Sequence, residues 1–258
     1  MRREIKYCIK NRYCILSFFL LSICCIQLVY PYPVVINSGG LWYALEHIVK
    51  DNDGFVRQVL LIFGSALPVV RITEELSANC HRNYVLRMGS RRYIASRMVG
   101  VVAASFISVV LMELVYLLMY LYAKPHHLYV VASNEICSDI PEGTPVWLQM
   151  VSLSLRIIRI GMYTAMWAAV TLAIAAWTDN RYIVLGAAYG LEKLLNMLTF
   201  WGLFYWRINP AYVFEGDHVR YTTPYSVESA TAILYNIIVI AIAWMLFSAG
   251  MKRRIASG

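Results

Sequence analysis

Long apolar runs separated by short polar segments are the dominant pattern along this chain. A helix needs about 20 residues to cross the hydrocarbon core of a bilayer, and six runs approach or exceed that length. These runs cover residues 14–31, 56–72, 98–123, 149–177, 182–206 and 228–250. The pattern predicts an all-α polytopic membrane protein, with one transmembrane domain over residues 1–258 that contains six transmembrane helices.

The second run is the weakest of the six. Its uninterrupted part, residues 59–70, is short and contains Gly64 and Pro68. With six spans and a cytoplasmic N-terminus, 15 of the 23 lysines and arginines fall in cytoplasmic segments, as the positive-inside rule requires. Without the second span, the six arginines of residues 71–97 would lie outside while the basic N-terminus stayed inside. We therefore expect six spans with both termini in the cytoplasm.

Composition supports a membrane protein and excludes several other classes. The chain is 60% hydrophobic and only 15% charged, too little polar surface for a soluble domain. The net charge of +8 does not indicate nucleic-acid binding, because the arginines gather at the ends of apolar runs. In the expected topology only Cys137 lies outside, so no intrachain disulfide framework is expected. The pairs Cys80-His81 and His126-His127 lack a second ligand pair, so no metal site is expected either.

The segments outside the runs are short. Pro31 and Pro33 stand where a signal peptide would have small residues, so we expect an uncleaved first span. Residues 5–14 form either an interfacial helix or a disordered basic tail, and residues 41–50 are expected to form an amphipathic helix. The external segments are too short for an enzyme domain and cover about residues 32–55, 124–148 and 207–227. An aromatic belt is expected from Trp42, Tyr43, Trp201, Tyr205 and Trp206.

Ionisable residues inside the expected spans are costly in lipid and are candidates for function. They are Glu113, Arg156, Arg159, Glu192 and Lys193. Arg156 and Arg159 share a helix face and either snorkel to the outer headgroups or line a substrate path. Glu192 and Lys193 point about 100° apart on a helix and need separate partners. Glu113, Glu192 and Lys193 either pair with a neighbouring helix or subunit, or line a translocation path.

Catalytic patterns are missing from the sequence. It contains no nucleophile elbow and no HExxH, so an intramembrane hydrolase has no support. It also lacks GxxxxGK[ST], so the chain does not bind ATP through a P-loop. A filter-like loop and a periodic charge series are absent, which disfavours a channel. We expect that the chain is not an enzyme and that any energy for transport enters from a partner.

The polar segment 71–97 predicts a helix, a tight break and a second helix. Thr73 is expected to cap a helix that carries Glu74 and Glu75 in its first turn and continues to Met88. Gly89 suits the C-terminal stop, and the serine after it suits the cap of the third span. A short helix held at the cytoplasmic face by two spans is a rigid element that an external force can move.

Together these features resemble the membrane subunit of an ABC-2 type transporter, in the group of small bacterial permeases for peptide export or immunity. The resemblance rests on six spans in about 250 residues, the basic start, Glu74-Glu75 after the second span, and RMGSRRYIASR at residues 87–97. It implies a coupling helix between spans two and three that contacts an ATPase subunit. The implied contact residues are Glu74, Glu75, Arg82, Arg87 and Arg91. The turn at residues 178–181 is a candidate secondary contact.

The resemblance also implies partners and a location. Two permeases, identical or paralogous, would enclose the substrate path in the bacterial plasma membrane. Two ATPase subunits would bind ATP and Mg²⁺, with no cofactor in this chain. The aromatic and methionine-rich faces favour an amphipathic, peptide-like or lipid-like substrate. The alternative is a non-transporting assembly or sensor protein whose basic loop binds a partner or anionic lipid.

Overall fold

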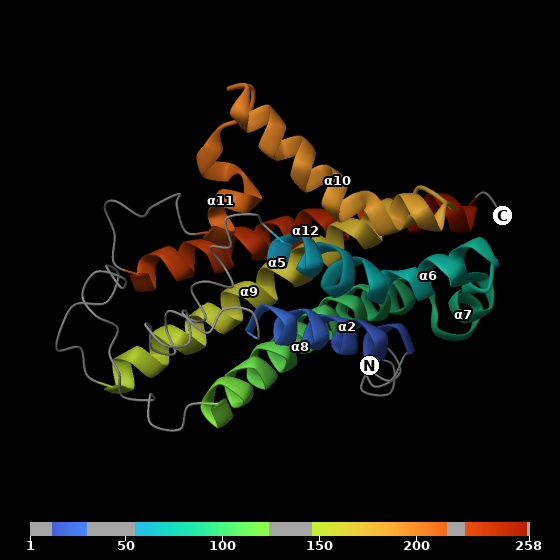
Figure 1. Ribbon diagram of the computed structural model, residues 1–258. Helices are drawn as coiled ribbons and strands as arrows, with labels where there is room; N and C mark the ends of the chain where they lie inside the picture. The colour runs from blue at the N-terminus through green and yellow to red at the C-terminus, as the bar shows by residue number, and fades with distance from the viewer. Residues whose placement is uncertain (1–11, 30–54, 124–145, 216–224, 257–258) are drawn as a thin grey trace.

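The computed structural model describes residues 12–29, 55–123, 146–215 and 225–256, and these residues contain helices but no strand (Figure 1). The all-α prediction is thereby confirmed for this part of the chain. The helices are α2 (Arg12–Val29), α5 (Phe55–Val59), η1 (Leu60–Ala66), α6 (Leu67–Ser77), α7 (His81–Met88), α8 (Ser90–Ala123), α9 (Val146–Ala175), α10 (Arg181–Phe200), η2 (Trp206–Ile208), α11 (Pro210–Glu215) and α12 (Tyr225–Ala256).

Four helical segments are long and apolar enough to cross a membrane, which indicates a membrane protein. They are Ser90–Val115, Ile157–Ala175, Arg181–Phe200 and Ser229–Ala256. The first and second apolar runs are helical too, in α2 and in the continuous segment α5–η1–α6. The count of six spans and the cytoplasmic orientation of the termini stay predictions. The expected helix at residues 41–50 and the basic segment before residue 12 lie outside the described residues.

The weak hydropathy of the second run has a structural cause. Its middle is the π-helix η1, whose Leu60 and Leu61 are almost completely buried, so the segment packs against other helices and not against lipid. Gly64 permits this packing, since a Cβ built there would lie 2.6 Å from Cγ2 of Thr164 in α9. Pro68 stands near the N-terminus of α6, where a missing N–H is tolerated. A buried span needs close packing more than a high content of large apolar residues.

Replacing Gly64 by alanine should therefore destabilise the helix bundle by about 1 to 3 kcal/mol, the usual cost of overpacking. The added methyl group has to displace the Thr164 side chain or move η1 away from α9. Thermal unfolding of the purified chain in detergent measures the loss. The matched control is Gly186→Ala in α10, where nothing lies within 4 Å of a built Cβ. An equal loss in both variants would show that helix approach does not limit position 64.

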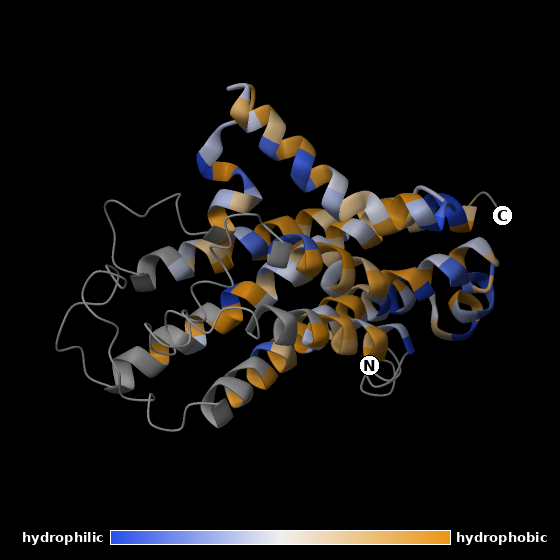
Figure 2. Cartoon of the chain, in the orientation of Figure 1, coloured by the Kyte–Doolittle hydropathy of each residue, from blue (hydrophilic) through white to orange (hydrophobic). Residues whose placement is uncertain are grey.

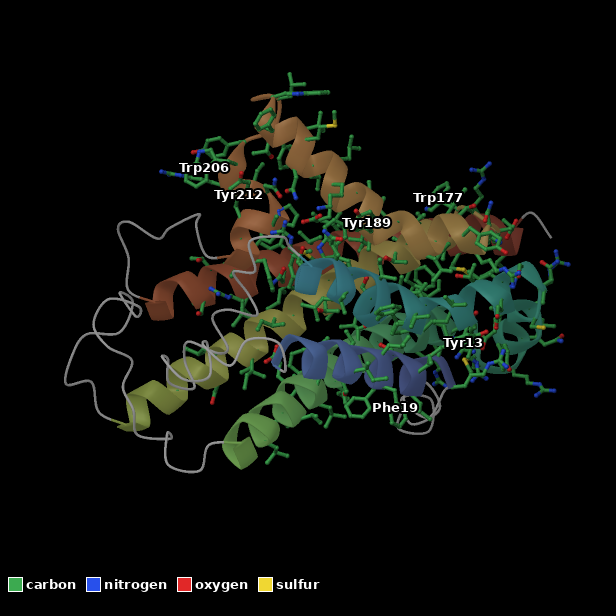
Figure 3. All side chains as sticks on the ribbon, viewed as in Figure 1. Tyr13, Phe19, Trp177, Tyr189, Trp206 and Tyr212 are labelled. Carbon is green, nitrogen blue, oxygen red and sulfur yellow. The ribbon has the colours of Figure 1, made fainter. Side chains whose placement is uncertain are left out.

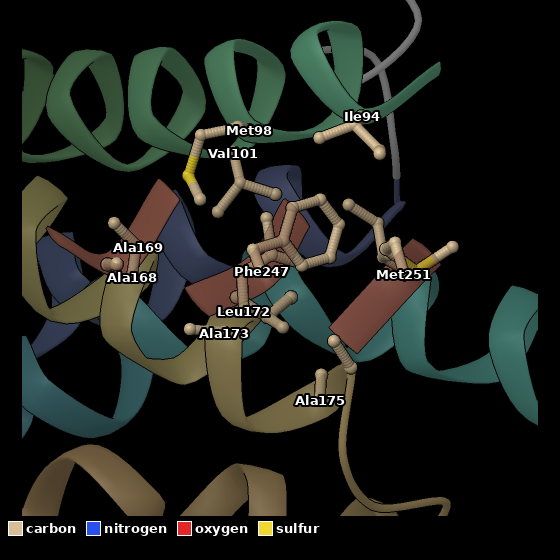
Figure 4. Close-up of a cluster of buried hydrophobic side chains, with 14 of the residues drawn as sticks. Ile94, Met98, Val101, Ala168, Ala169, Leu172, Ala173, Ala175, Phe247 and Met251 are labelled. Atoms are coloured by element: carbon tan, nitrogen blue, oxygen red, sulfur yellow. The ribbon is translucent and has the colours of Figure 1, made fainter. Parts of the chain in front are cut away.

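The central helix of the fold is α9, which α8, α12 and η1 surround. Figure 4 shows how α12 packs on it: Phe247 lies among Leu172 and small residues of α9, with Met98 and Val101 of α8 on the other side. Alanines at several positions of α9 allow this large ring to approach the helix backbone closely. The interior of the bundle is consequently continuous from α8 through α9 to α12.

Polar segments gather at one end of the bundle, which we call the basic end. It comprises the first turn of α2, helix α7, the turn between α9 and α10, and the last turns of α12 (Figure 1). Two contacts connect side chains at this end. Tyr13 of α2 contacts Glu74, near the end of α6, and Arg254 of α12 contacts Asp179 of the turn. Figure 2 shows hydrophilic residues concentrated around α7 and the end of α12.

The helix of the expected fifth span, α10, is shorter than predicted. Helix α10 ends at Phe200, short of the predicted residue 206, because Gly202 adopts a positive φ of 71° that turns the backbone. The chain then returns through η2 to the short helix α11. Trp201, Tyr205 and Trp206 of the expected aromatic belt lie on this return and are exposed. In Figure 3, Trp206 and Tyr212 lie together at the far end of α10.

Candidate functional site

A buried ion pair fixes α7 against the membrane helices. Nη2 of Arg97, on α8, lies 2.8 Å from Oε2 of Glu75, on α6, and the two side chains are only 6% and 11% exposed. The same guanidinium lies 5.1 Å from the ring centre of Tyr84, on α7, and 5.2 Å from that of Tyr93. Arg71 adds a second, longer contact to Glu75 at 3.5 Å. One arginine thus joins three helices.

The electrostatics of Glu75 follow from its position. Burial raises the pKa of the Glu75 carboxyl, while the charges of Arg97 and Arg71 act in the opposite direction. Glu75 therefore serves the internal packing of the basic end. Its side chain is only 11% exposed, and a contact with another protein stays a prediction.

The neighbouring Glu74 ties α2 to the same assembly. The Tyr13 hydroxyl of α2 donates a hydrogen bond of 2.5 Å to Oε1 of Glu74. Tyr13 itself carries the guanidinium of Arg12 above its ring at 4.9 Å. The first helix is consequently connected to the start of the polar segment by side chains and not by apolar packing alone.

The remaining predicted contact residues lie on the surface. Arg82 and Arg87 of α7 and Arg91 of α8 are exposed, and Leu86 between them is 83% exposed. Within the described ranges no carboxylate forms an ion pair with these three arginines. Helix α7 thus presents a basic, partly apolar outer face, while Tyr84 on its inner side stacks against Tyr93 with ring centres 6.4 Å apart.

The predicted start of the short helix was wrong, and its predicted end is confirmed. Thr73 does not cap a helix: its hydroxyl donates to the Val69 carbonyl at 3.2 Å, within α6, which continues to Ser77. A turn containing Asn79, with φ of 54°, then separates α6 from α7. Gly89 ends α7 with φ of 81°, and α8 begins at the next residue. The Glu74-Glu75 pair therefore lies near a helix C-terminus, where ion pairing and not the helix dipole stabilises it.

The turn between α9 and α10 is held by one local and one long-range interaction. Oδ1 of Asn180 accepts a hydrogen bond of 2.9 Å from the Tyr182 N–H and caps α10. Oδ1 of Asp179 accepts a hydrogen bond of 2.6 Å from Nη1 of Arg254. A contact between this turn and a partner stays a prediction.

A second polar group lies along α10, and we call it the α10 polar ladder. It consists of Arg57, Glu192, Asn196, Thr199 and Asn209. Nε of Arg57 lies 2.8 Å from Oε1 of Glu192, which also accepts from Nδ2 of Asn196 at 3.0 Å. Nδ2 of Asn209 donates to Oδ1 of Asn196 at 2.9 Å and to the Thr199 hydroxyl at 2.8 Å. Glu192 is thereby paired with the start of the second run.

The other ionisable residues do not join this ladder. Nζ of Lys193 lies 5.6 Å from the ring centre of Tyr189 on a different face of α10, as expected for adjacent helical residues. Glu113 and Arg159 are buried, at 0% and 2% exposure, in α8 and α9. The Arg159 guanidinium is thus enclosed by protein. The Arg156 side chain lies outside the described positions.

Sequence reasoning missed two members of the ladder that carry it across helices. Arg57 lies in the second apolar run but was not among the candidate residues, and neither was Asn209. The detectable signal was the spacing of Glu192, Asn196 and Thr199, which puts three polar side chains on one face of an otherwise apolar helix. Such a face indicates partners inside the protein.

The described part of the chain contains no candidate metal centre. No group of three histidine, cysteine or acidic side chains there is arranged to hold a metal ion. Cys14 is buried and Cys80 is exposed, both as free thiols. No family model and no curated protein matches the sequence. The basic end and the α10 polar ladder are therefore the features from which a function has to be inferred.

Proposed function

We propose that the chain is the permease subunit of an ATP-binding-cassette transporter in the bacterial plasma membrane, resembling the ABC-2 type. It would move an amphipathic substrate, such as a peptide, with energy from a separate ATPase subunit that binds ATP and Mg²⁺. The observation that carries this proposal is the attachment of α7. A short helix with an exposed basic face is held at the helix ends by the Glu75–Arg97 pair and the ring of Tyr84.

The attachment suits the transmission of force. Since Arg97 contacts residues of α6, α7 and α8, a displacement of α7 moves the ends of two long helices with it. ATP-driven closure of the ATPase subunits would use this connection to favour one of two arrangements of the permease pair. In this scheme Glu75 and Arg97 transmit the movement, and the exposed arginines receive it. A second permease copy would complete the substrate path.

Replacing Arg87 and Arg91 together by alanine should weaken binding of the ATPase subunit by about tenfold or more. Each exposed arginine contributes up to about 1 kcal/mol to such a contact. The measurement is co-purification and affinity of the full chain with a P-loop ATPase encoded in an adjacent reading frame. Neither side chain has a carboxylate partner in the described residues, so the fold should remain intact.

The control for this experiment is Lys252→Ala, which removes an exposed charge from α12 at the same end of the molecule. We expect it to bind the ATPase as the unchanged chain does. Unaltered affinity in the double variant would exclude the outer face of α7 as the docking element. A chain that binds no ATPase at all would favour the assembly or sensor protein.

A further inference from the structure

A cavity of about 310 Å³ opens at the basic end. It lies where the start of α7, the turn between α9 and α10, and the last turns of α12 meet. Its polar wall is formed by Asn79, His81, Arg82, Asp179, Arg253 and Arg254, and the indole of Trp177 also contributes. The transport scheme above assigns Arg82 and the turn to contacts with a partner, but it gives the cavity itself no role. Its volume is near the lower limit of sites that bind small molecules.

The wall of the cavity carries an excess of positive charge. Arg254 is committed to the fold, since it donates to the Ala176 carbonyl and to Asp179, both at 2.6 Å. Arg82 and Arg253 are exposed, and in the described part of the chain neither pairs with a carboxylate. The cavity wall therefore contains three guanidiniums but one carboxylate, that of Asp179. An anion in the cavity would balance a charge that the protein leaves uncompensated.

A buried histidine, His81, also lines this wall, with its ring near the backbone of Glu75. His81 is 2% exposed, and neither ring nitrogen has a hydrogen bond of ordinary geometry to a described residue. Burial lowers the pKa of His81, and the charges of Arg254 and Arg82 lower it further. The imidazole is therefore neutral near pH 7 and keeps one N–H for donation. Buried polar groups without a partner in a protein are commonly satisfied by a ligand or by water.

The remaining wall suits a ligand at a membrane surface. The indole of Trp177 is half exposed, directly after the end of α9, and the Arg253 guanidinium lies 5.6 Å from its ring. Figure 3 shows Trp177 on the outer side of the bundle, near the end of α12. Tryptophan beside arginine at the ends of apolar helices is typical of the headgroup layer. The cavity thus offers a cationic interior next to an amphipathic rim.

We propose that this cavity binds the phosphate group of an anionic phospholipid. Guanidinium groups match the several oxygens of a phosphate through paired N–H donors, and Arg82 and Arg253 approach the space from two different helices. Basic pockets between membrane helices at the cytoplasmic surface bind such headgroups. A carboxylate from a partner protein fits less well, because it would have to enter a concave space beside the indole of Trp177.

The test uses the purified full chain without any ATPase, so its result does not depend on the transport proposal. Short-chain phosphatidylglycerol, short-chain phosphatidylcholine and inorganic phosphate are added separately, and binding is followed by native mass spectrometry and thermal unfolding. We expect saturable binding of phosphatidylglycerol that raises the unfolding temperature. Arg82→Gln and Arg253→Gln should each weaken it about fivefold. The control Arg92→Gln, an exposed arginine of α8 outside the cavity, should leave it unchanged.

The three additives separate the sources of the anion. Binding of inorganic phosphate with the same dependence on Arg82 and Arg253 would support phosphate recognition and identify the free ion as a ligand. Equal binding of phosphatidylcholine and phosphatidylglycerol would overturn the requirement for a net negative lipid. Loss of binding in Arg92→Gln as large as in the cavity variants would overturn the site. Stabilisation by an ATPase subunit alone, with none by the phosphate compounds, would assign the cavity to protein docking.

Discussion

Replacing Arg97 by methionine is expected to lower the free energy of unfolding by about 3 to 5 kcal/mol, the usual cost of removing one member of a buried ion pair. Methionine keeps an extended apolar side chain but removes the positive charge that pairs with Glu75. The Glu75 side chain is only 11% exposed and lies 2.8 Å from the guanidinium. Tyr84 and Tyr93 lose the same cation from their ring faces. Thermal and denaturant unfolding of the purified chain in detergent measure the loss.

A double-mutant cycle separates this pair from its surroundings. Glu75→Gln should also destabilise, and the combination with Arg97→Met should cost less than the sum of the single changes. The exposed Arg92, five positions before Arg97 on the same helix, supplies the control Arg92→Met, with an expected change within about 0.5 kcal/mol. Additive losses in the cycle would mean that Arg97 acts through the tyrosine rings and not through Glu75.

The Arg97→Met variant also separates two roles: the attachment of α7 to the other helices, and the docking of an ATPase subunit on α7. In Arg97→Met the exposed face with Arg87 and Arg91 is unchanged, so affinity for an ATPase subunit should largely persist. In the proposed transporter, stimulation of ATP hydrolysis by substrate should fall, because movement of α7 would no longer be passed to α6 and α8. Loss of affinity equal to that of the Arg87 and Arg91 double variant would contradict this division of roles.

Much of the helical framework was predictable from local patterns. Each of the six apolar runs contains a helix, because a helix satisfies the backbone hydrogen bonds of an apolar segment within the segment itself. The end of α7 was also predictable. Gly89 adopts a positive φ of 81° that side chains with a Cβ rarely accept, and α8 begins at the following residue.

Helix phase and long-range pairing were not predictable in the same way. The expected cap at Thr73 was a reasonable local reading, but packing of Ile72 and Leu76 in the interior extends α6 through that position. Glu75 therefore lies against Arg97 in the interior of the basic end. Likewise, the pairing of Arg57 with Glu192 depends on α5 lying beside α10, which no local spacing encodes.

The continuous segment α5–η1–α6 contributes to both polar groups. The continuous segment α5–η1–α6 carries Arg57 at its start and Glu75 near its end, so ion pairs fix it to α10 and to α8. Gly64 holds its middle against α9. The run that hydropathy supports least thus belongs to a segment held by specific contacts near both ends and in its middle. In the proposed transporter it connects α7 mechanically with the α10 polar ladder.

Replacing Glu192 by leucine is expected to destabilise the bundle by about 3 to 5 kcal/mol, since it removes a carboxylate that is 1% exposed and paired with Arg57 at 2.8 Å. The loss should spread along the ladder, because Asn196 also loses the acceptor of its 3.0 Å hydrogen bond. Glu192→Gln keeps an oxygen acceptor there and should lose less. Unfolding of the three proteins in the same detergent gives the comparison.

The adjacent Lys193 supplies the matched control, because it is ionisable, lies at the same depth and faces away from the ladder toward Tyr189. Lys193→Leu should change the free energy of unfolding by less than about 1 kcal/mol, as for a partly exposed charge. Asn209→Ala tests the far end: it removes the donor to Asn196 and Thr199 and the cap of α11. If Lys193→Leu cost as much as Glu192→Leu, depth in the membrane and not the ladder would account for the loss. If only Glu192→Leu and Asn209→Ala are damaging, the polar face of α10 is what holds α5 and α11 in place.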